Sequence, residues 1–155
     1  MNEYTQADCI RDTKEHIEQV RGNILEMVGN LIARAMEHDQ SKLESPEVEI
    51  FTEYTPKLKN STYGSDEYKG FLTGMGEALK HHYEHNSHHP EHYENGIKGM
   101  DLLDVVEMFC DWKAATMRHA DGDIIKSIEH NKNRFKYSDD LEEIFKNTAK
   151  NFAWI

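Results

Sequence analysis

A histidine and an aspartate stand side by side where a predicted helix ends. His38 and Asp39 are followed by Gln40-Ser41-Lys42 and then by a second helix start. Neutral imidazole and ionised carboxylate are ordinary ligands for Mn, Fe, Co, Ni or Zn. Because both side chains can turn to one cation, we expect His38 and Asp39 to bind a divalent transition metal. The alternative is a solvated helix C-terminus, where the helix dipole favours histidine.

Two basic residues flank this pair. Lys42 could hold a substrate phosphate as a point charge. The alternative is that Lys42 is a solvated surface cation. Arg34 lies one helical turn before His38 and could also bind phosphate, with a salt bridge as the alternative. We expect both residues to contact substrate, and Lys42 to take part in catalysis.

Six of the ten histidines fall within twelve residues, from His81 to His92. The segment joins the end of an apolar-faced helix to a loop that contains Pro90. The helix and the loop could therefore fix the positions of these histidines. Histidine-rich tracts also bind metal loosely at surfaces. The helix end offers His81 or His82, and the loop offers His88 or His89. We select His82 and His89 as metal ligands.

Two further histidines of this segment are expected beside the ligands, supporting them or facing the substrate. We assign His85 to proton transfer and His92 to substrate contact.

Three acids lie on one face of a predicted helix. Asp104, Glu107 and Asp111 are separated by three and four residues, which places them on the same side. A solvated acidic stripe is one reading. Asp111, however, lies in the most apolar part of the helix, and a carboxylate there requires a metal or a basic partner. We select Asp111 as the ligand and Asp104 as its substitute and as a second candidate for proton transfer.

These motifs resemble the HD-domain superfamily of metal-dependent phosphohydrolases over roughly residues 12–118. The similar parts are His38-Asp39 with Lys42, the helix start Ser45-Pro46-Glu47, and the Asp111 context Phe109-Cys110-Asp111-Trp112-Lys113-Ala114-Ala115. Many members have Ile-Gly where this chain has Gln40-Ser41.

The resemblance implies a first ligand on an earlier helix, which would be His16, and Asp111 as the late aspartate. It also implies one or two divalent ions, the second completed by two histidines of the cluster, and a small phosphorylated substrate, most often a nucleotide. A minority of HD-like proteins are diiron oxygenases, which gives a second hypothesis. A non-enzymatic helical module that binds a metal or ligand is the third.

Hydrophobic periodicity and cap signals predict an all-α, HD-domain-like bundle of six or seven helices. We expect a single domain over residues 1–155, with its core in 12–118 and C-terminal helices in 124–152. The predicted helices are 12–38, 46–55, 65–84, 101–117, 124–135 and 139–152. Asp101 and Ser138 are the expected N-caps of the fourth and the last of these helices.

The first of these helices conflicts with the proposed ligand set. One unbroken helix would separate His16 from His38 by about 33 Å. A reversal at Gly22-Asn23 or Gly29-Asn30 would bring both residues to the same end. The resemblance favours the reversal, and we expect it.

Composition excludes several classes of partner. The net charge of −11 argues against a protein that grips nucleic-acid polymers or anionic membranes through a basic face. Cys9 and Cys110 form no disulfide framework, and no signal peptide or apolar span is apparent, so we expect a cytoplasmic protein.

Overall fold

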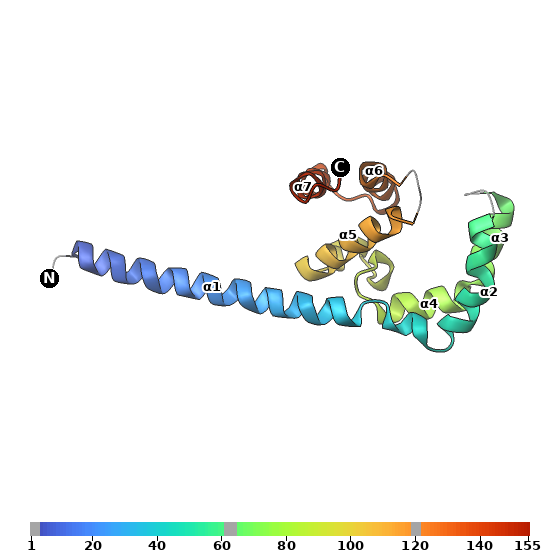
Figure 1. Ribbon diagram of the computed structural model, residues 1–155, viewed down its shortest axis with the longest axis horizontal. Coiled ribbons are helices and arrows are strands. Elements are labelled where there is room, and N and C mark those ends of the chain that lie inside the picture. The colour runs from blue at the N-terminus through green and yellow to red at the C-terminus, as the bar shows by residue number, and fades with distance from the viewer. Residues whose placement is uncertain (1–3, 61–64, 119–121) are drawn as a thin grey trace. The chain divides into compact units, whose positions relative to one another are not determined.

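The computed structural model describes residues 4–60, 65–118 and 122–155. Within these ranges the chain has seven α-helices, three short 3-10 helices and no strand (Figure 1). The all-α prediction is therefore confirmed. The chain divides into two units, Met1–Glu37 and His38–Ile155. In the described part of the chain, no helix has the length and apolar character needed to cross a membrane.

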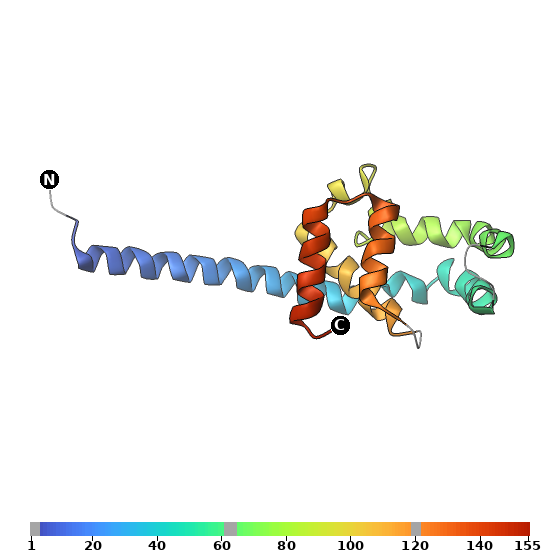
Figure 2. The ribbon, with the colours of Figure 1, turned by 90° about the horizontal axis from the view of Figure 1, so that it is seen from above.

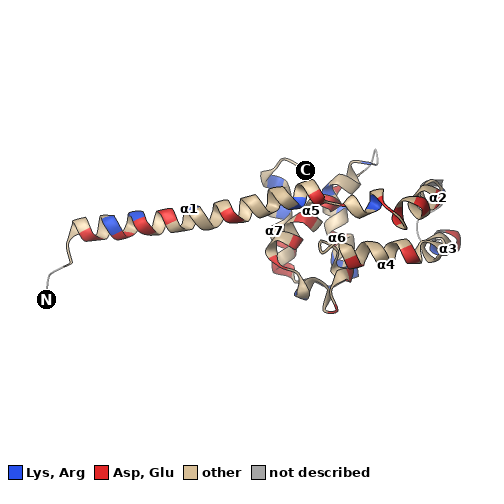
Figure 3. Ribbon diagram, turned by 90° about the horizontal axis from the view of Figure 1, so that it is seen from below, with Lys and Arg blue, Asp and Glu red and all other residues tan. Residues whose placement is uncertain are grey.

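The first unit consists of α1, one uninterrupted helix over Gln6–Glu37, so the predicted reversal is wrong. Gly22 and Gly29 lie inside it, and each lowers helix stability by only about 1 kcal/mol relative to alanine. Charged residues of both signs gather in its N-terminal half (Figure 3), where Arg21 pairs with Glu18 one turn earlier. Local ion pairs of this kind support a continuous helix.

The continuous helix removes His16 from the predicted ligand set. Glu37 lies 21 positions after His16, which corresponds to about 32 Å along the helix. His38 follows Glu37 directly, so within one chain His16 cannot share an ion with His38.

The second unit holds the remaining elements. They are the 3-10 helix η1 (Gln40–Leu43), α2 (Glu47–Asn60), α3 (Asp66–Gly74), α4 (Gly76–His85), the 3-10 helices η2 (Pro90–His92) and η3 (Gly96–Gly99), α5 (Leu102–Thr116), α6 (Ile124–Phe135) and α7 (Asp139–Asn151). In this unit α2 packs against α4, and α6 lies beside α7 (Figure 2).

In the second unit, two predicted boundaries differ from the observed ones, and α1 begins at Gln6 instead of the predicted residue 12. The helix predicted to end before Pro56 continues as α2 to Asn60, because a proline removes one backbone hydrogen bond without always ending a helix. The helix predicted over 65–84 is divided into α3 and α4 at Met75, whose ψ is 0°. This break falls between Gly74 and Gly76, residues with low helix propensity.

The apolar core of the second unit lies among α5, α6 and α7. Its buried residues are Met108, Phe109, Trp112, Ile124, Ile128, Tyr137, Phe145 and Ala149. Phe109 stacks on Phe145 with ring centroids 4.7 Å apart. The cluster contains residues of α5 and also residues of α6 and α7. The two C-terminal helices are therefore part of the core that supports α5.

The two faces of α5 have different roles. Met108, Phe109 and Trp112 face the core, whereas Glu107 and Asp111 approach histidines elsewhere in the unit. The predicted N-cap is confirmed, because the Asp101 carboxylate accepts hydrogen bonds from the backbone N–H groups of Leu103 and Asp104. Core packing and a capped start thus hold the acidic face of α5 in place.

Candidate metal centre

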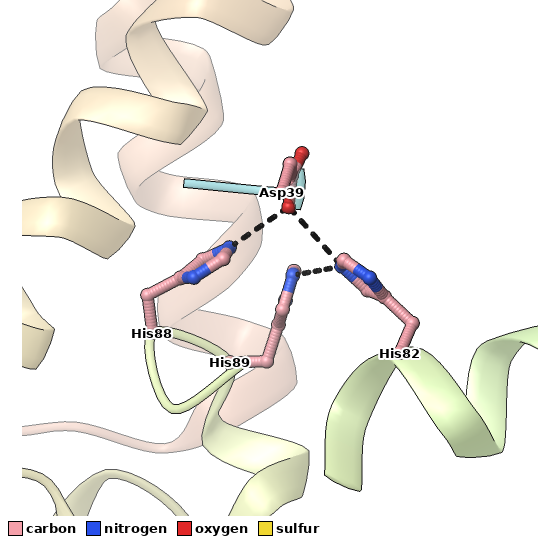
Figure 4. A group of neighbouring side chains, drawn as sticks. All are labelled: Asp39, His82, His88 and His89. Atoms are coloured by element: carbon pink, nitrogen blue, oxygen red, sulfur yellow. Dashed lines mark hydrogen bonds and ion pairs between the residues drawn. The ribbon is translucent and has the colours of Figure 1, made fainter. Parts of the chain in front are cut away.

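Four side chains from three segments converge in the second unit (Figure 4). Asp39 precedes η1, His82 lies in the last turn of α4, and His88 and His89 come from the loop that follows α4. Asp39 has a φ of 57°, a left-handed conformation that aspartate adopts more readily than most residues. This conformation ends the preceding helix and turns the carboxylate toward the histidines.

The spacing of these groups fits one ion. One ligand atom from each residue lies within 4.8 Å of all the others. Asp39 Oδ1 is 3.4 Å from His82 Nε2 and 3.6 Å from His88 Nε2, and His82 Nε2 is 2.9 Å from His89 Nε2. Tetrahedral ligands with bonds near 2 Å lie about 3.3 Å apart. The observed separations bracket that value.

Two atoms of this group are buried without a hydrogen-bond partner in the described chain. They are Asp39 Oδ1 and His88 Nε2, and they face each other in Figure 4. A buried polar atom left unpaired carries a free-energy penalty of about 1–3 kcal/mol. A divalent cation would satisfy both atoms at once, so the donor set fits a metal ion.

A buried glutamate orients His82. Glu47 is 0% exposed, and its Oε2 lies 2.9 Å from His82 Nδ1. The Asn86 amide also lies near this nitrogen, but its two protons have acceptors in Ser41 Oγ and the His82 carbonyl oxygen. Nδ1–H therefore donates to Glu47, and the Nε2 lone pair points to Asp39. This carboxylate–histidine arrangement is typical of metal ligands.

A second group of possible ligands shares Asp39. His38 Nε2 lies 3.4 Å from Asp39 Oδ2 and 3.9 Å from Asp111 Oδ1, and these three residues could hold an ion. Lys42 Nζ lies 2.6 Å from the same Oδ2 atom. The two oxygens of Asp39 therefore serve different neighbours.

Burial favours the neutral imidazole of His82 and His89. It lowers the pKa of His82. For His89, burial first and then electrostatic interaction with His88 and His82 lower the pKa to about 2. Burial opposes the charged form of Asp39, but the hydrogen bond and charge of Lys42 bring the pKa of this carboxyl below its ordinary value. Neutral imidazole and ionised carboxylate are the forms that bind metals.

The structure brings together five of the six residues selected as ligands. They are His38, Asp39, His82, His89 and Asp111, and His16 is the exception. Lys42 lies against Asp39, and its contact with a substrate phosphate stays a prediction. Arg34 lies in the last turn of α1, in the other unit, and its contact with substrate stays a prediction.

Three other selected residues lie outside the metal-ligand groups found among the described residues. His85 is exposed and stacks on His81, and its Nδ1 donates to the His81 carbonyl oxygen. His92 Nδ1 donates to the Tyr83 carbonyl oxygen. Their proposed catalytic and substrate-binding roles stay predictions.

Asp104 is 2% exposed and is surrounded by donors. It accepts hydrogen bonds from Ser87 Oγ at 2.6 Å, Tyr93 Oη at 2.5 Å and the Asp101 backbone N–H at 3.0 Å. Burial and the bond to Asp104 raise the pKa of Tyr93 to about 12, so this phenol remains a donor. Asp104 therefore anchors the loop on α5, and its part in proton transfer stays a prediction.

Sequence reasoning missed three contributors. His88 was expected only as the alternative to His89, whereas both join the group. Glu47 and Glu107 bond to histidines 35 and 69 residues away in sequence. The acidic face of α5 was the signal for Glu107, but Glu47 looked like an ordinary acid at a helix start.

Comparison with the curated proteins and with the solved structures gives no match. A family model, described as a family of unknown function (DUF5662), matches residues 5–151. This match spans α1, the metal-ligand groups and the helices of the core. The chain therefore belongs to this family of unknown function, DUF5662.

Proposed function

We propose that this protein binds a divalent transition metal through Asp39, His82, His88 and His89. The observation that carries the proposal is a pair of buried atoms without a hydrogen-bond partner in the described chain, Asp39 Oδ1 and His88 Nε2, which lie 3.6 Å apart. Mn, Fe, Co, Ni and Zn all accept such a mixture of imidazole and carboxylate ligands.

We further propose that the protein is a metal-dependent phosphohydrolase acting on a small phosphorylated molecule, with nucleotides as the first class to test. This rests on the HD-like order of His38-Asp39 and Asp111. A divalent ion held at such a centre lowers the pKa of a bound water and polarises a phosphoryl oxygen. Lys42 lies close enough for its charge to lower the pKa of His82 and His89, and it would attract the substrate phosphate.

The test has two steps. Protein purified without a histidine tag is analysed for bound metal, beside His88→Ala. We expect about one or two ions per chain in the parent protein and a clear loss in the variant. The metal-loaded protein is then assayed for phosphate release from nucleotides and small phosphate esters. A parent protein that binds no metal would contradict both proposals, and full metal without phosphate release would contradict only the hydrolase.

A diiron oxygenase is the second candidate. The observation that favours it is the sharing of Asp39 between two ligand groups, since a bridging carboxylate suits two adjacent ions. Anaerobic purification followed by metal analysis separates the candidates. Two irons per chain with substrate-dependent oxygen consumption would favour the oxygenase, whereas Mn, Co, Ni or Zn with phosphate release would favour the hydrolase.

The expected partner is a small molecule in the cytoplasm. The charge of −11 disfavours a nucleic-acid polymer or an anionic membrane as the ligand. A small anion is compatible with an acidic protein because the ion and Lys42 supply local positive charge. Cys9 and Cys110 are both free and exposed, as is common in a reducing compartment.

A further inference from the structure

One carboxylate oxygen on α5 contacts two histidines from separate segments. Glu107 Oε1 lies 2.8 Å from His38 Nδ1 and 3.0 Å from His88 Nδ1. The two rings approach to 4.5 Å between centroids. The Glu107 side chain is only 13% exposed and that of His88 is 2% exposed, whereas His38 is 29% exposed.

These contacts determine which nitrogens face Asp39. An ionised carboxylate only accepts hydrogen bonds, so each Nδ1 must carry the proton. The Nε2 atoms are then the ones that point at Asp39, with His38 Nε2 3.4 Å from Oδ2 and His88 Nε2 3.6 Å from Oδ1. A single carboxylate thus orients histidines that approach opposite oxygens of Asp39.

Glu107 could instead be a ligand itself, because it forms a possible group with His38 and His88. In that arrangement the ion would take the Nδ1 atoms of both rings. His88 Nε2 would then carry the proton and face Asp39 Oδ1 at 3.6 Å, which is too long for a hydrogen bond, so these two buried atoms would still lack one. The supporting position leaves no such atoms once an ion is bound.

We infer that Glu107 is a positioning residue that holds His38 and His88 in the tautomer whose Nε2 atoms face the metal centre. The inference rests on the proposed metal binding. Glu47 does the same for His82 from α2, but Glu107 joins three segments: the His38-Asp39 turn, the loop after α4, and α5. Loss of its charge should therefore weaken metal binding without removing a ligand.

The test compares Glu107→Gln with the parent protein in zinc titrations. We expect the dissociation constant to rise about 10–100-fold, the range for such supporting groups, with the same number of ions bound at saturating zinc. Glu84→Gln is the matched control, because Glu84 is an exposed residue of α4 whose charge partner is Lys80 at 3.8 Å. It should leave zinc affinity unchanged.

Two further measurements separate positioning from ligation. Long-range ¹⁵N–¹H spectra of the zinc-loaded parent should show His38 and His88 protonated at Nδ1. In a His88→Ala background, Glu107→Gln should produce a smaller fold-change than in the parent, because the two residues act together.

Coordination through Nδ1, or a Glu107→Gln variant with parental affinity, would overturn the inference while leaving the metal site standing. A parent protein that binds no zinc or other divalent ion would instead remove the proposed function, and the inference with it.

Discussion

At the scale of single residues, Asp39 connects most of the groups in the centre. Its Oδ1 atom approaches His82 and His88, and its Oδ2 atom approaches Lys42 and His38. Removing its charge should therefore weaken metal binding at both groups of possible ligands that contain Asp39. A substitution of this residue is the most direct test of the site.

We expect Asp39→Asn to weaken metal binding by at least about 100-fold, since it removes a charged ligand and not merely a supporting group. Metal per chain, measured by elemental analysis, checks this. Asp66→Asn on α3 is the control, because Asp66 is fully exposed and forms an ion pair with Lys69 at 3.5 Å. Full metal content in the Asp39→Asn protein would refute the assignment.

Substitutions of the two aspartates of α5 should have different effects, one on the free energy of unfolding and the other on metal affinity. Asp104→Ala removes the acceptor of the Tyr93 and Ser87 hydroxyl groups, so the free energy of unfolding should fall by about 1–3 kcal/mol. The number of metal ions bound per chain at saturating metal should stay the same. Asp111→Asn should leave that free energy within about 0.5 kcal/mol but lower metal affinity about 10-fold or more.

Denaturant unfolding of the metal-free proteins and metal titration of each variant measure the two effects. Unchanged metal binding with a lowered free energy of unfolding in Asp111→Asn would move the ligand assignment away from Asp111.

At the scale of elements, the segment between α4 and α5 matters most, because it carries His88 and His89. Its backbone is held by Tyr93, whose hydroxyl donates to Asp104. Gly99 in η3 lies directly against this tyrosine. A Cβ atom at residue 99 would come within 2.7 Å of Tyr93 Cβ, and an atom attached to the backbone cannot move aside alone.

Gly99→Ala should therefore lower the free energy of unfolding by about 1–3 kcal/mol, as overpacking does. Gly76→Ala is the control within the same unit, because a Cβ there has no atom within 4 Å. Helix propensity predicts a gain of up to about 1 kcal/mol for that variant. Denaturant unfolding of both proteins checks the opposite signs, and equal stabilities would contradict the close approach of Gly99 and Tyr93.

At the scale of the whole molecule, the second unit holds both the candidate metal centre and an apolar core. Within the described residues, the three possible ligand groups and the buried apolar cluster all lie in residues 38–155. A unit with its own core can fold alone.

We accordingly expect the fragment 38–155 to unfold cooperatively and to bind the same number of metal ions per chain as the full-length protein. Circular dichroism during thermal unfolding and elemental analysis of both proteins test this. A fragment that is folded yet free of metal would show that α1 supplies part of the site.

The sequence alone determined the features that depend on neighbouring residues. Helical periodicity placed Glu107 and Asp111 on one face of α5, and local chemistry identified the N-caps Asp101 and Ser138. Residue type singled out His38-Asp39 and the histidine segment. These signals are short-range, because capping and helix faces involve residues no more than four positions apart.

The tertiary structure decided which of these groups meet. It excluded His16, because the glycines of α1 do not end that helix, and it added His88, because the loop after α4 turns both of its adjacent histidines inward. It also buried Glu47 against a histidine 35 residues away. Such pairings depend on how separate helices pack around a common core, and no local pattern in the chain specifies them.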